Sequence, residues 1–474
     1  MPPGPFRWPL IGNTLQVPQV HPWLTYSRWA RVYGDIFYLD ALGQHIIVIN
    51  SARVARELLD RRSSIYSGRP HLVWGDRMLI MQPYGDELRQ QRRLISQTLS
   101  TSTIGQYYDI QEAAARRLVL GVIDNPSSLE GQIKTNIASI IMLVVYGYTV
   151  KGTEDMFAER AIQVVDNLSL AATPGICAIK YVPSWMPGIS SLKTAKAWRK
   201  LLHTTNGMTA PCILSGVINH AACLQENGTA HLPNLCASVL SDAEGKATLQ
   251  LEESLKWVAF SVLTGGLDTN ISTIISFILA MLRFPDVQKK AQAEIDAVVG
   301  SERLPQISDR PSLPYIRSVI AETYRWLPAT PLSVPHALDE DDIYDGSFLP
   351  KGSIIMPNVW HMLHDPNIYP EPDAFKPERY GGSDIEMKKV TDIAFGFGRR
   401  ACPGFYFAQG TIFSIVVTVL ATCDIVPIVD NHGREIIPDV RYSTKIILCP
   451  EDVKCTFRPR SEQAKLALVD TCSD

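Results

Sequence analysis

A cysteine in the last third of the chain lies in a sequence context that suits a thiolate. Cys402 follows two closely spaced glycines, Gly396 and Gly398, and precedes Pro403, which occupies a typical first helical position. The apolar run Phe405–Thr422 predicts the helix itself. The sulfur would then lie near unsatisfied backbone N–H groups and the positive end of the helix dipole, which lower the pKa of a thiol. Taken alone, this spacing still favours a buried structural cysteine, because cysteine is often fully buried.

A second segment with chemical potential interrupts the long predicted helix Glu252–Arg283. Gly265 and Gly266 are adjacent there, and glycine inside a helix costs about 1 kcal/mol relative to alanine. Close packing of another helix would explain both glycines. A functional explanation is that Thr269, one turn after Gly265, bonds a backbone carbonyl with its hydroxyl and opens the helix.

A third feature is an opposite-charge pair, Glu322 and Arg325, on the predicted helix Leu313–Trp326. The apolar stripe of this helix consists of Ile316, Val319, Ile320, Thr323 and Leu327. Periodicity therefore predicts that the pair points away from the core. An exposed pair at this spacing stabilises a helix by only about 0.2–0.5 kcal/mol.

The elements that must position these residues are mostly helical. Residues 35–50 predict a hairpin around Leu42-Gly43. Further predicted helices are Ala52–Asp60, Asp86–Gln97, Gln111–Ile123, Ile133–Tyr146, Met156–Ala171, Ser191–Gly216 and one that begins at Pro285 and is closed by Gly300. The last third mixes proline-rich irregular segments with short strands. The expected fold is a single, mainly α unit with a minor β part.

Composition excludes several classes of protein. The chain has 474 residues, of which 46% are hydrophobic and 20% are charged, so a large core can form. Its 45 basic and 48 acidic residues give a net charge of −3 without a basic block, which argues against a nucleic-acid partner. Nine cysteines form no CxxC pair, which argues against a zinc site or a disulfide scaffold and fits a reducing compartment. No signal peptide is expected, and the longest apolar runs are shorter than a membrane span. The chain is expected to be soluble, or to lack its anchor.

The ten residues Phe395–Gly404 match the pattern F-x-x-G-x-R-x-C-x-G at every fixed position. In this stretch the chain resembles the cytochrome P-450 superfamily. The resemblance implies a mainly α fold with minor β structure, with haem b between the long central helix and the helix after the cysteine. It implies that the Cys402 thiolate ligates the haem iron, that Phe395 packs against the sulfur, and that Gly398 permits the bulge. Arg400 would bond a haem propionate.

The resemblance extends to the other two features. Glu322 and Arg325 match the family's E-x-x-R, and Pro377–Tyr380 resembles its P-E-R-F. Glu322, Arg325 and Arg379 would then form a buried structural network of charges, in which removal of one charge strands another.

The stretch 264–270 resembles the oxygen-activation groove of the family, A/G-G-x-D/E-T. By this resemblance Thr269 and Asp268 are catalytic. Thr269 would hydrogen-bond the oxygen bound to iron, and Asp268 would relay protons through water. The presence of both favours monooxygenation over the rearrangement branches of the family.

Two further residues are candidate contacts of the haem propionates. Arg92 matches the arginine of the family's W-x-x-x-R, but Leu88 replaces the tryptophan, which puts one propionate hydrogen bond in doubt. His336 falls where the family often has a basic contact. By the same resemblance, the substrate pocket is formed by residues 71–81, 260–267, 329–334 and 442–444, which are mostly apolar.

The resemblance implies a haem-thiolate monooxygenase that takes electrons from NADPH through a reductase and inserts one oxygen atom from O₂ into an apolar small molecule. A terpenoid, polyketide or aromatic substrate of secondary metabolism is expected, because 64–69, 84–93 and 395–404 look most like fungal members. A reductase-independent peroxygenase or isomerase is the first alternative. The second is a haem-free binding protein on the same scaffold.

The resemblance also predicts domains, partners and location. Residues 1–34 would form a proline-rich hinge and an N-terminal helix, and 35–474 one catalytic domain with β-rich parts near 35–50, 328–360 and 430–458. The reductase would dock through five basic residues, Arg89, Arg93, Lys388, Lys389 and Arg399. The apolar segment Ile176–Gly188 would touch a membrane. With an anchor, the protein would lie on the cytosolic face of the endoplasmic reticulum membrane.

Overall fold

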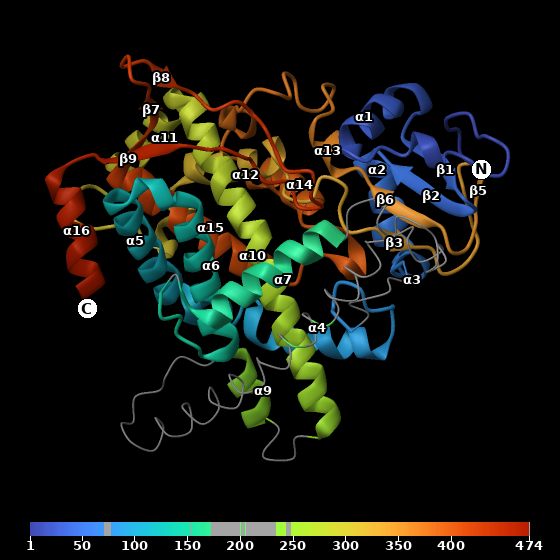
Figure 1. Cartoon of the computed structure of the whole chain (residues 1–474), viewed down its shortest axis with the longest axis horizontal. Coiled ribbons are helices and arrows are strands. Elements are labelled where there is room, and N and C mark those ends of the chain that lie inside the picture. Colours follow the sequence, from blue (N-terminus) through green and yellow to red (C-terminus); the bar gives the residue numbers. More distant parts are fainter. Residues whose placement is uncertain are drawn as a thin grey trace.

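The computed structural model of the chain describes residues 1–70, 77–152, 154–171, 234–242 and 248–473, with residues 200 and 204. Most of the structure is helical, and the strands are short (Figure 1). The helices are α1 Pro22–Tyr33, α2 Ala52–Ala55, α3 Ser63–Tyr66, α4 Asp86–Leu99, α5 Tyr108–Asp124, α6 Leu129–Tyr146, α7 Met156–Ala171, α9 Leu235–Asp242, α10 Leu249–Arg283, α11 Pro285–Val298, α12 Pro314–Trp326, α13 Val359–Leu363, α14 Asp384–Ala394, α15 Phe405–Thr422 and α16 Glu462–Ser473. The mainly α class is therefore as expected. The predicted helix 191–216 lies almost entirely outside the described residues.

The strands form three small sheets. They are β1 Ile36–Ala41, β2 Gln44–Ile49, β3 His336–Ala337, β4 Asp342–Tyr344, β5 Ser347–Leu349, β6 Ile354–Pro357, β7 Cys423–Val429, β8 Glu435–Ile436 and β9 Cys455–Pro459. The sheet orders are β1-β2-β6-β3, β4-β5 and β8-β7-β9. The first sheet lies on the N-terminal side of the molecule, opposite α16 at the other end (Figure 1).

The hairpin predicted for 35–50 is confirmed. β1 and β2 pair antiparallel, with Ala41 opposite Gln44. The two turn residues, Leu42 and Gly43, have φ angles of +50° and +80°. Two left-handed residues are what a tight hairpin turn needs.

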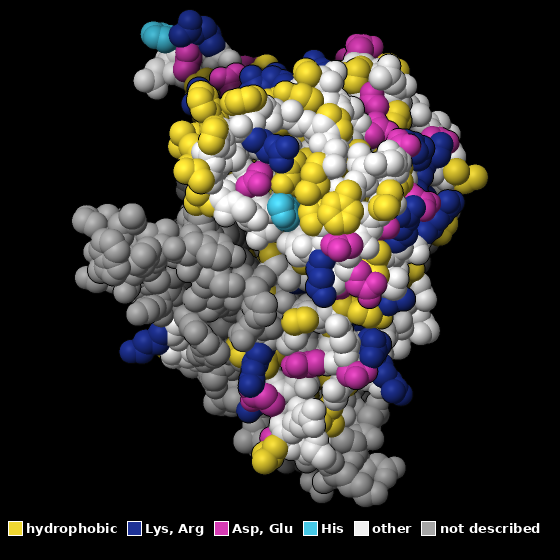
Figure 2. Space-filling model, turned by 90° about the vertical axis from the view of Figure 1, so that its right-hand side faces the viewer, with side chains coloured by type: hydrophobic (Ala, Val, Ile, Leu, Met, Phe, Trp, Pro, Cys, Tyr) yellow, Lys and Arg dark blue, Asp and Glu magenta, His cyan; other side chains and the backbone are white. Residues whose placement is uncertain are grey.

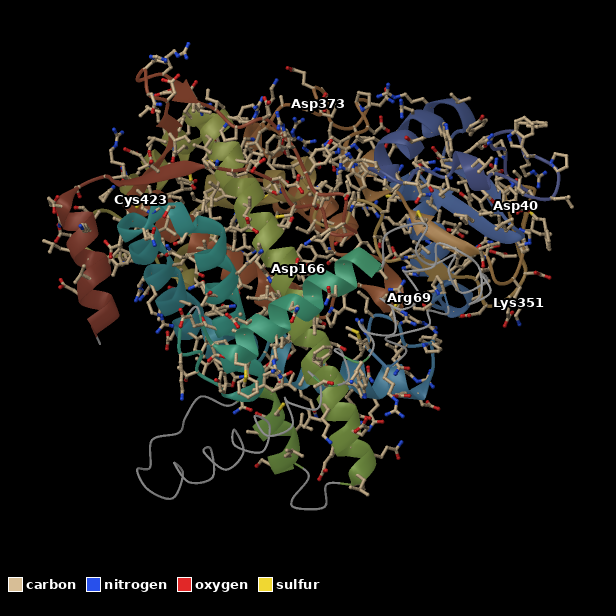
Figure 3. All side chains as sticks on the ribbon, in the orientation of Figure 1. Asp40, Arg69, Asp166, Lys351, Asp373 and Cys423 are labelled. Carbon is tan, nitrogen blue, oxygen red and sulfur yellow. The ribbon has the colours of Figure 1, made fainter. Side chains whose placement is uncertain are left out.

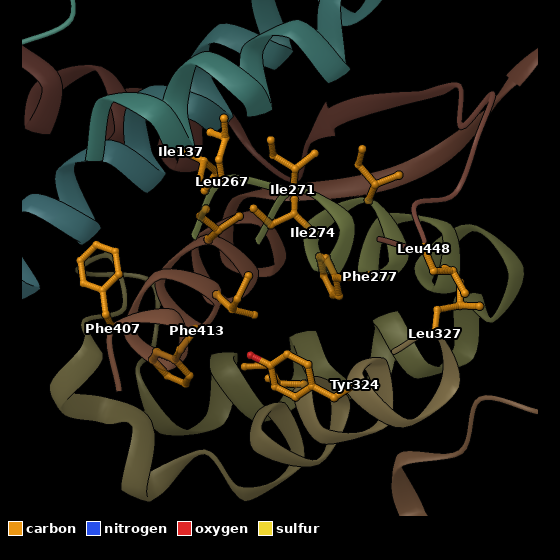
Figure 4. Packing of buried hydrophobic residues seen from close by; sticks show 14 of the residues in the cluster. Ile137, Leu267, Ile271, Ile274, Phe277, Tyr324, Leu327, Phe407, Phe413 and Leu448 are labelled. Carbon is orange, nitrogen blue, oxygen red and sulfur yellow. The ribbon is translucent and has the colours of Figure 1, made fainter. Parts of the chain in front are cut away.

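Helix α10 is the central element of the core. It begins at a cap in which the Thr248 hydroxyl accepts a hydrogen bond from the Leu251 N–H at 3.2 Å. It packs against α6, α7, α12 and α15, and Figure 4 shows side chains of α6, α10, α12 and α15 converging in the core. α10 and α15 are long and apolar enough to cross a membrane, but 78% and 72% of their apolar windows are buried in the protein. Their hydrophobicity therefore serves the core.

Several of these helices were not predicted from the sequence, and α14 and α16 are the longest of them. α14 is capped by Ser383, whose hydroxyl accepts a hydrogen bond from the Glu386 N–H. It buries Met387 and Val390 and packs against α12. α16 packs against α5 through Leu468, which is fully buried. Both are short, and short helices are marginal on propensity alone, so tertiary packing decides whether they form.

Candidate active site

The loop before α15 has a shape that only glycine permits. Gly396 and Gly398 have φ angles of +83° and +53°. A Cβ on Gly398 would lie 2.1 Å from the backbone oxygen of Leu59, so the two segments can approach this closely only without a side chain. The Cys402 N–H closes the loop by donating to the Phe395 carbonyl at 2.8 Å. The cysteine is thereby held rigidly just before α15.

Cys402 faces cavities inside the protein. Its side chain is deeply enclosed, and it still has accessible surface because that surface lines two cavities. Burial raises the pKa of the Cys402 thiol, while the Gly404 N–H and the charge of Arg92 act in the opposite direction. Burial is the larger effect, so a cation bound at the sulfur would be needed to hold it as thiolate.

Phe395 lies beside this cysteine in a cluster of rings. Its ring meets that of Tyr324 at 5.1 Å and that of Phe405 at 4.8 Å, both edge to face. Phe395 and Cys402 line the same two cavities. These rings thus contribute an aromatic wall to the cavities that Cys402 lines, and packing of Phe395 against the sulfur stays a prediction.

The first of these cavities, here called the central cavity, has a volume of about 260 Å³. It lies between α10 and the cysteine loop with the start of α15. Its lining comprises Arg69, Leu79, Ile80, Leu88, Arg92, Ile95, Leu99, Ser261, Val262, Gly265, Gly266, Thr269, Asn270, Thr273, Tyr324, Pro328, Ala329, Thr330, Ser333, Val334, His336, Ala394, Phe395, Gly396, Arg400, Cys402, Pro403, Gly404, Phe407 and Ala408. Most of this surface is apolar, and its polar groups are concentrated in a few places.

Three arginines and a histidine meet at the central cavity. Arg400 donates to the carbonyls of Ser67 and Leu79 at 2.9 and 3.4 Å. Arg92 donates to the Ala401 carbonyl at 3.0 Å. His336 bonds the Tyr66 carbonyl through Nδ1 at 2.8 Å.

Arg69 belongs to this cluster, although its place in the sequence did not single it out. Its guanidinium donates to the carbonyls of Val334 and Pro335, both at 2.9 Å. Figure 3 shows it beside the strands of the first sheet. Leu88, the residue in place of the family's tryptophan, is buried and lines the same cavity. Only folding brings Arg69 beside Arg92 and Arg400, because these residues are far apart in the sequence.

This cluster fits a ligand that carries carboxylates. Burial lowers the pKa of Arg69, of Arg92, of His336 and of Arg400, the last to about 10, and the arginines repel one another. Among the described residues, none of the three arginines has a carboxylate within 4 Å. Buried cations need anionic partners. A flat apolar ring with two carboxylates, as in haem, matches both the apolar lining and this charge.

The Thr269 hydroxyl bonds the Gly265 carbonyl at 2.8 Å, as its spacing suggested. Helix α10 nevertheless continues through this segment without a break, so the expected opening of the helix is wrong. A carbonyl oxygen has two lone pairs and can accept a hydroxyl in addition to the backbone N–H. The two adjacent glycines have different roles. A Cβ on Gly266 would lie 3.0 Å from Cδ1 of Ile141, so this glycine allows close packing against α6. A Cβ on Gly265 would have no neighbour within 4 Å.

Asp268 does not line the central cavity. Its carboxylate accepts a hydrogen bond from the Ser169 hydroxyl at 2.7 Å, and burial raises the pKa of Asp268. The structure therefore separates Asp268 from Thr269, and the role of Asp268 as a proton relay stays a prediction. Asn270 and Thr273 line the cavity instead.

Glu322 and Arg325 are fully buried, so the exposed position inferred from periodicity is wrong. Arg325 holds Glu322 with two hydrogen bonds of 2.8 Å, and both side chains are 0% exposed. Arg379 and the Tyr380 hydroxyl also donate to Glu322, at 3.1 and 2.7 Å. The segment 363–380 covers the polar side of α12, and Arg325 bonds its carbonyls at Leu363, Pro372 and Ala374. Tertiary packing thus buries the charged pair that the helical pattern of α12 predicts to be exposed.

Most described parts of the expected substrate pocket do line the central cavity, but 442–444 do not. Tyr442 packs against the rings of Trp23 and Trp360 at 6.0 Å each. Further along the same loop, the Leu448 N–H donates to the carbonyl of Ala329, a residue of the cavity wall, at 2.9 Å. Residues 71–76 lie outside the described part of the chain.

Comparison with known proteins gives one family. The model of the cytochrome P-450 family matches residues 2–450. Cytochrome P-450 monooxygenases 226 and 105 of Postia placenta are 82% and 72% identical to the chain, over 99% of it and 90% and 91% of their own lengths. A solved zebra fish cytochrome P-450 with abiraterone has a TM-score of 0.74 at 23% identity, covering 93% of this chain and all of that one. This last similarity concerns the fold.

Proposed function

Because this chain belongs to the cytochrome P-450 family and is a monooxygenase of that family, we propose that it inserts one oxygen atom from O₂ into an apolar small molecule. The observation that supports this most strongly is that Cys402 and Thr269 line one largely apolar cavity. Haem, when bound, supplies the activation of O₂.

The residues of the chain have distinct tasks in this proposal. Cys402 would hold the haem iron. The two haem carboxylates would be held by Arg69, Arg92, Arg400 and His336. The apolar lining excludes water and orients the substrate. The Thr269 hydroxyl donates its single proton to the Gly265 carbonyl in this structure, and it would have to rotate to present that proton to the central cavity.

Apolar residues of three separate segments support an apolar substrate. Leu79 and Ile80, Val262 on α10, and Ala329 with Val334 all line the central cavity. We infer that the substrate is a terpenoid, polyketide or aromatic compound of fungal secondary metabolism. Spectral titration of the ferric protein with a panel of such compounds tests this. A shift with none of the three classes would contradict the substrate inference.

Electron supply separates this proposal from its rivals. Product should form only with NADPH and a reductase. Product formed equally well with hydrogen peroxide alone would instead indicate a peroxygenase, and turnover without either would indicate an isomerase. A purified chain without a haem spectrum would indicate a binding protein.

Thr269→Ala should reduce the yield of product per NADPH by at least about tenfold, because a positioned proton donor typically contributes at least that much to rate. NADPH consumption and peroxide release are measured beside product. Thr264→Ala is the matched control, since the Thr264 hydroxyl bonds the Phe260 carbonyl at 2.9 Å and is outside the cavity lining. Equal coupling in the two variants would remove Thr269 from proton delivery.

The docking site of the reductase is proposed on the face that carries the cysteine loop. Of the five basic residues expected there, Lys388 is paired with Asp392, Lys389 with Glu386 and Arg89 with Asp86. Arg93 and Arg399 are exposed and have no ion pair among the described residues. Arg399 lies 4.8 Å from the centre of the Tyr84 ring. These two arginines therefore have charge left for an acidic partner.

Arg93→Glu with Arg399→Glu should raise the KM for the reductase several-fold, and more so at low salt, since exposed charges are screened by ions. Lys388→Glu with Lys389→Glu should raise it less, because each lysine already has a carboxylate partner. Steady-state kinetics across ionic strengths measures both. A KM that does not depend on salt would contradict docking at this face.

Association with the endoplasmic reticulum membrane is also proposed. The segment Ile176–Gly188, expected to touch the bilayer, lies outside the described residues. A second apolar surface supports contact: Phe6, Trp8, Leu10, Leu15 and Val20 are all exposed, Leu10 almost completely. Figure 2 looks onto the side with the N-terminus and shows hydrophobic side chains gathered there. Apolar side chains with tryptophan suit a membrane interface.

The chain should therefore sediment partly with liposomes. Trp8→Asp with Leu10→Asp should release it while leaving the haem spectrum unchanged. Ile385→Asp, at an exposed position on α14, is the control. Equal sedimentation of the double variant and the control would exclude this surface.

A further inference from the structure

A second cavity, here called the outer cavity, lies beside the cysteine loop and has a volume of about 420 Å³. It shares Tyr324, Phe395, Gly396 and Cys402 with the central cavity. Its other walls come from α12, α14, the start of α15 and Arg310, and no residue of α10 lines it. The size suits a small organic molecule. The reaction proposed above does not use this space.

One cation of the outer cavity is unbalanced. Lys388 is paired with Asp392, and Arg317 with Asp384. Arg310 donates to the neutral Gln409 side chain at 2.9 Å and has no ion pair among the described residues. The Arg310 side chain is largely removed from water, and this burial lowers the pKa of Arg310. A charge in such a place is costly unless an anion accompanies it.

Two residues that line the same cavity each carry a buried hydrogen-bond donor without a partner. Within the described part of the chain, Nε of Arg317 and the hydroxyl of Tyr324 are buried and have no partner. Both residues line the outer cavity, and the Tyr324 hydroxyl interacts electrostatically with Arg310. Buried polar groups normally have partners, so two orphans next to an unbalanced cation indicate a missing acceptor.

The remaining wall combines the two ion pairs, Thr391 and the Tyr406 and Gln409 side chains with an apolar part. Ile320 and Ala321 contribute from α12, Met387 from α14, and Phe405 from α15. A ligand that fills the cavity thus meets an apolar surface, two ion pairs, and one cation, Arg310, that has no carboxylate partner among the described residues.

We propose that the outer cavity binds a small amphipathic organic acid. Its carboxylate accepts hydrogen bonds from Arg310, Arg317 and Tyr324, and its apolar body packs on Ile320, Met387 and Phe405. The site is separate from the substrate site, although both adjoin Cys402.

The test titrates the holoprotein with 2-naphthoate, followed by its fluorescence, and with the neutral 2-naphthamide as a probe of the same shape. Clotrimazole is added in excess to fill the central cavity. We expect 2-naphthoate to bind with and without clotrimazole, and 2-naphthamide to bind at least tenfold more weakly. Loss of naphthoate binding in clotrimazole would place it in the central cavity and overturn the proposal. Equal affinity for the amide, or no binding by the wild type, would also overturn it.

Variants locate the site. Arg310→Gln should weaken 2-naphthoate at least tenfold and Tyr324→Phe several-fold, the latter without any change of charge. Arg458→Gln is the control, because Arg458 is an exposed cation on β9 paired with Asp424. The ferrous–CO spectrum reports whether each variant is folded. If Arg310→Gln does not fold, Tyr324→Phe decides the matter, and wild-type affinity in a folded variant would contradict the proposed contact.

Discussion

Cys402→Ser is expected to abolish the thiolate-type ferrous–CO spectrum and with it monooxygenase turnover. A thiolate donates electron density to iron, which favours cleavage of the O–O bond, and a serine hydroxyl does not. The loop that presents the cysteine should survive, because the backbone bond from Cys402 to Phe395 and the glycine turn do not involve the sulfur. The loss of the spectrum and of turnover should therefore come from the changed iron ligand and not from a changed loop structure.

The spectra of the reduced, CO-bound wild type and Cys402→Ser measure this effect. Cys423→Ser is the control, since Cys423 is buried just beyond the other end of α15 and outside both cavities. It should keep the wild-type Soret position. The same Soret position in Cys402→Ser would show that another group ligates the iron.

Glu322→Ala should destabilise the folded protein by about 3–5 kcal/mol, the usual effect of removing one partner from a buried charge pair. The carboxylate accepts bonds from Arg325, Arg379, Tyr380 and the backbone N–H of Lys376. Its removal leaves the buried Arg325 charge uncompensated. Because the network joins α12 to the segment 363–380, little haem protein should accumulate.

Urea unfolding and the haem content of the purified protein measure the effect. Glu386→Gln, which removes an exposed partner of Lys389 at the same i, i+3 spacing, should cost less than about 1 kcal/mol. Similar losses of unfolding free energy in the two variants would contradict the expected effect of burying Glu322.

Local features were predictable because neighbouring residues determine them. Gly43 in the hairpin turn and the glycines of the loop before Cys402 adopt left-handed backbone, which glycine tolerates, and that is written in the sequence. Leu42 adopts it as well, although its residue type does not favour it. The bond from Thr269 to the Gly265 carbonyl follows from helical spacing alone. For the same reason the order of the long helices could be predicted.

What lies around each helix was not predictable from its own period. The stripe on α12 indicated that Glu322 faces water, and a segment some fifty residues later covers it (Lys376 donates to it at 2.8 Å). Asp268 and Thr269 are neighbours on α10, yet successive side chains on a helix point in different directions. The Asp268 carboxylate therefore meets α7, where the Ser169 hydroxyl donates a hydrogen bond to it.

The sequence by itself therefore determined the thiolate motif, the class of fold and, through resemblance, the family. Tertiary structure alone decided which charges meet. Arg69, Arg92 and Arg400 join one cavity from three distant segments, and Arg310, Arg317 and Tyr324 join another. The physical reason is that spacing fixes contacts only within a turn or a helix face, whereas burial and electrostatic compensation depend on segments that the chain brings together when it folds.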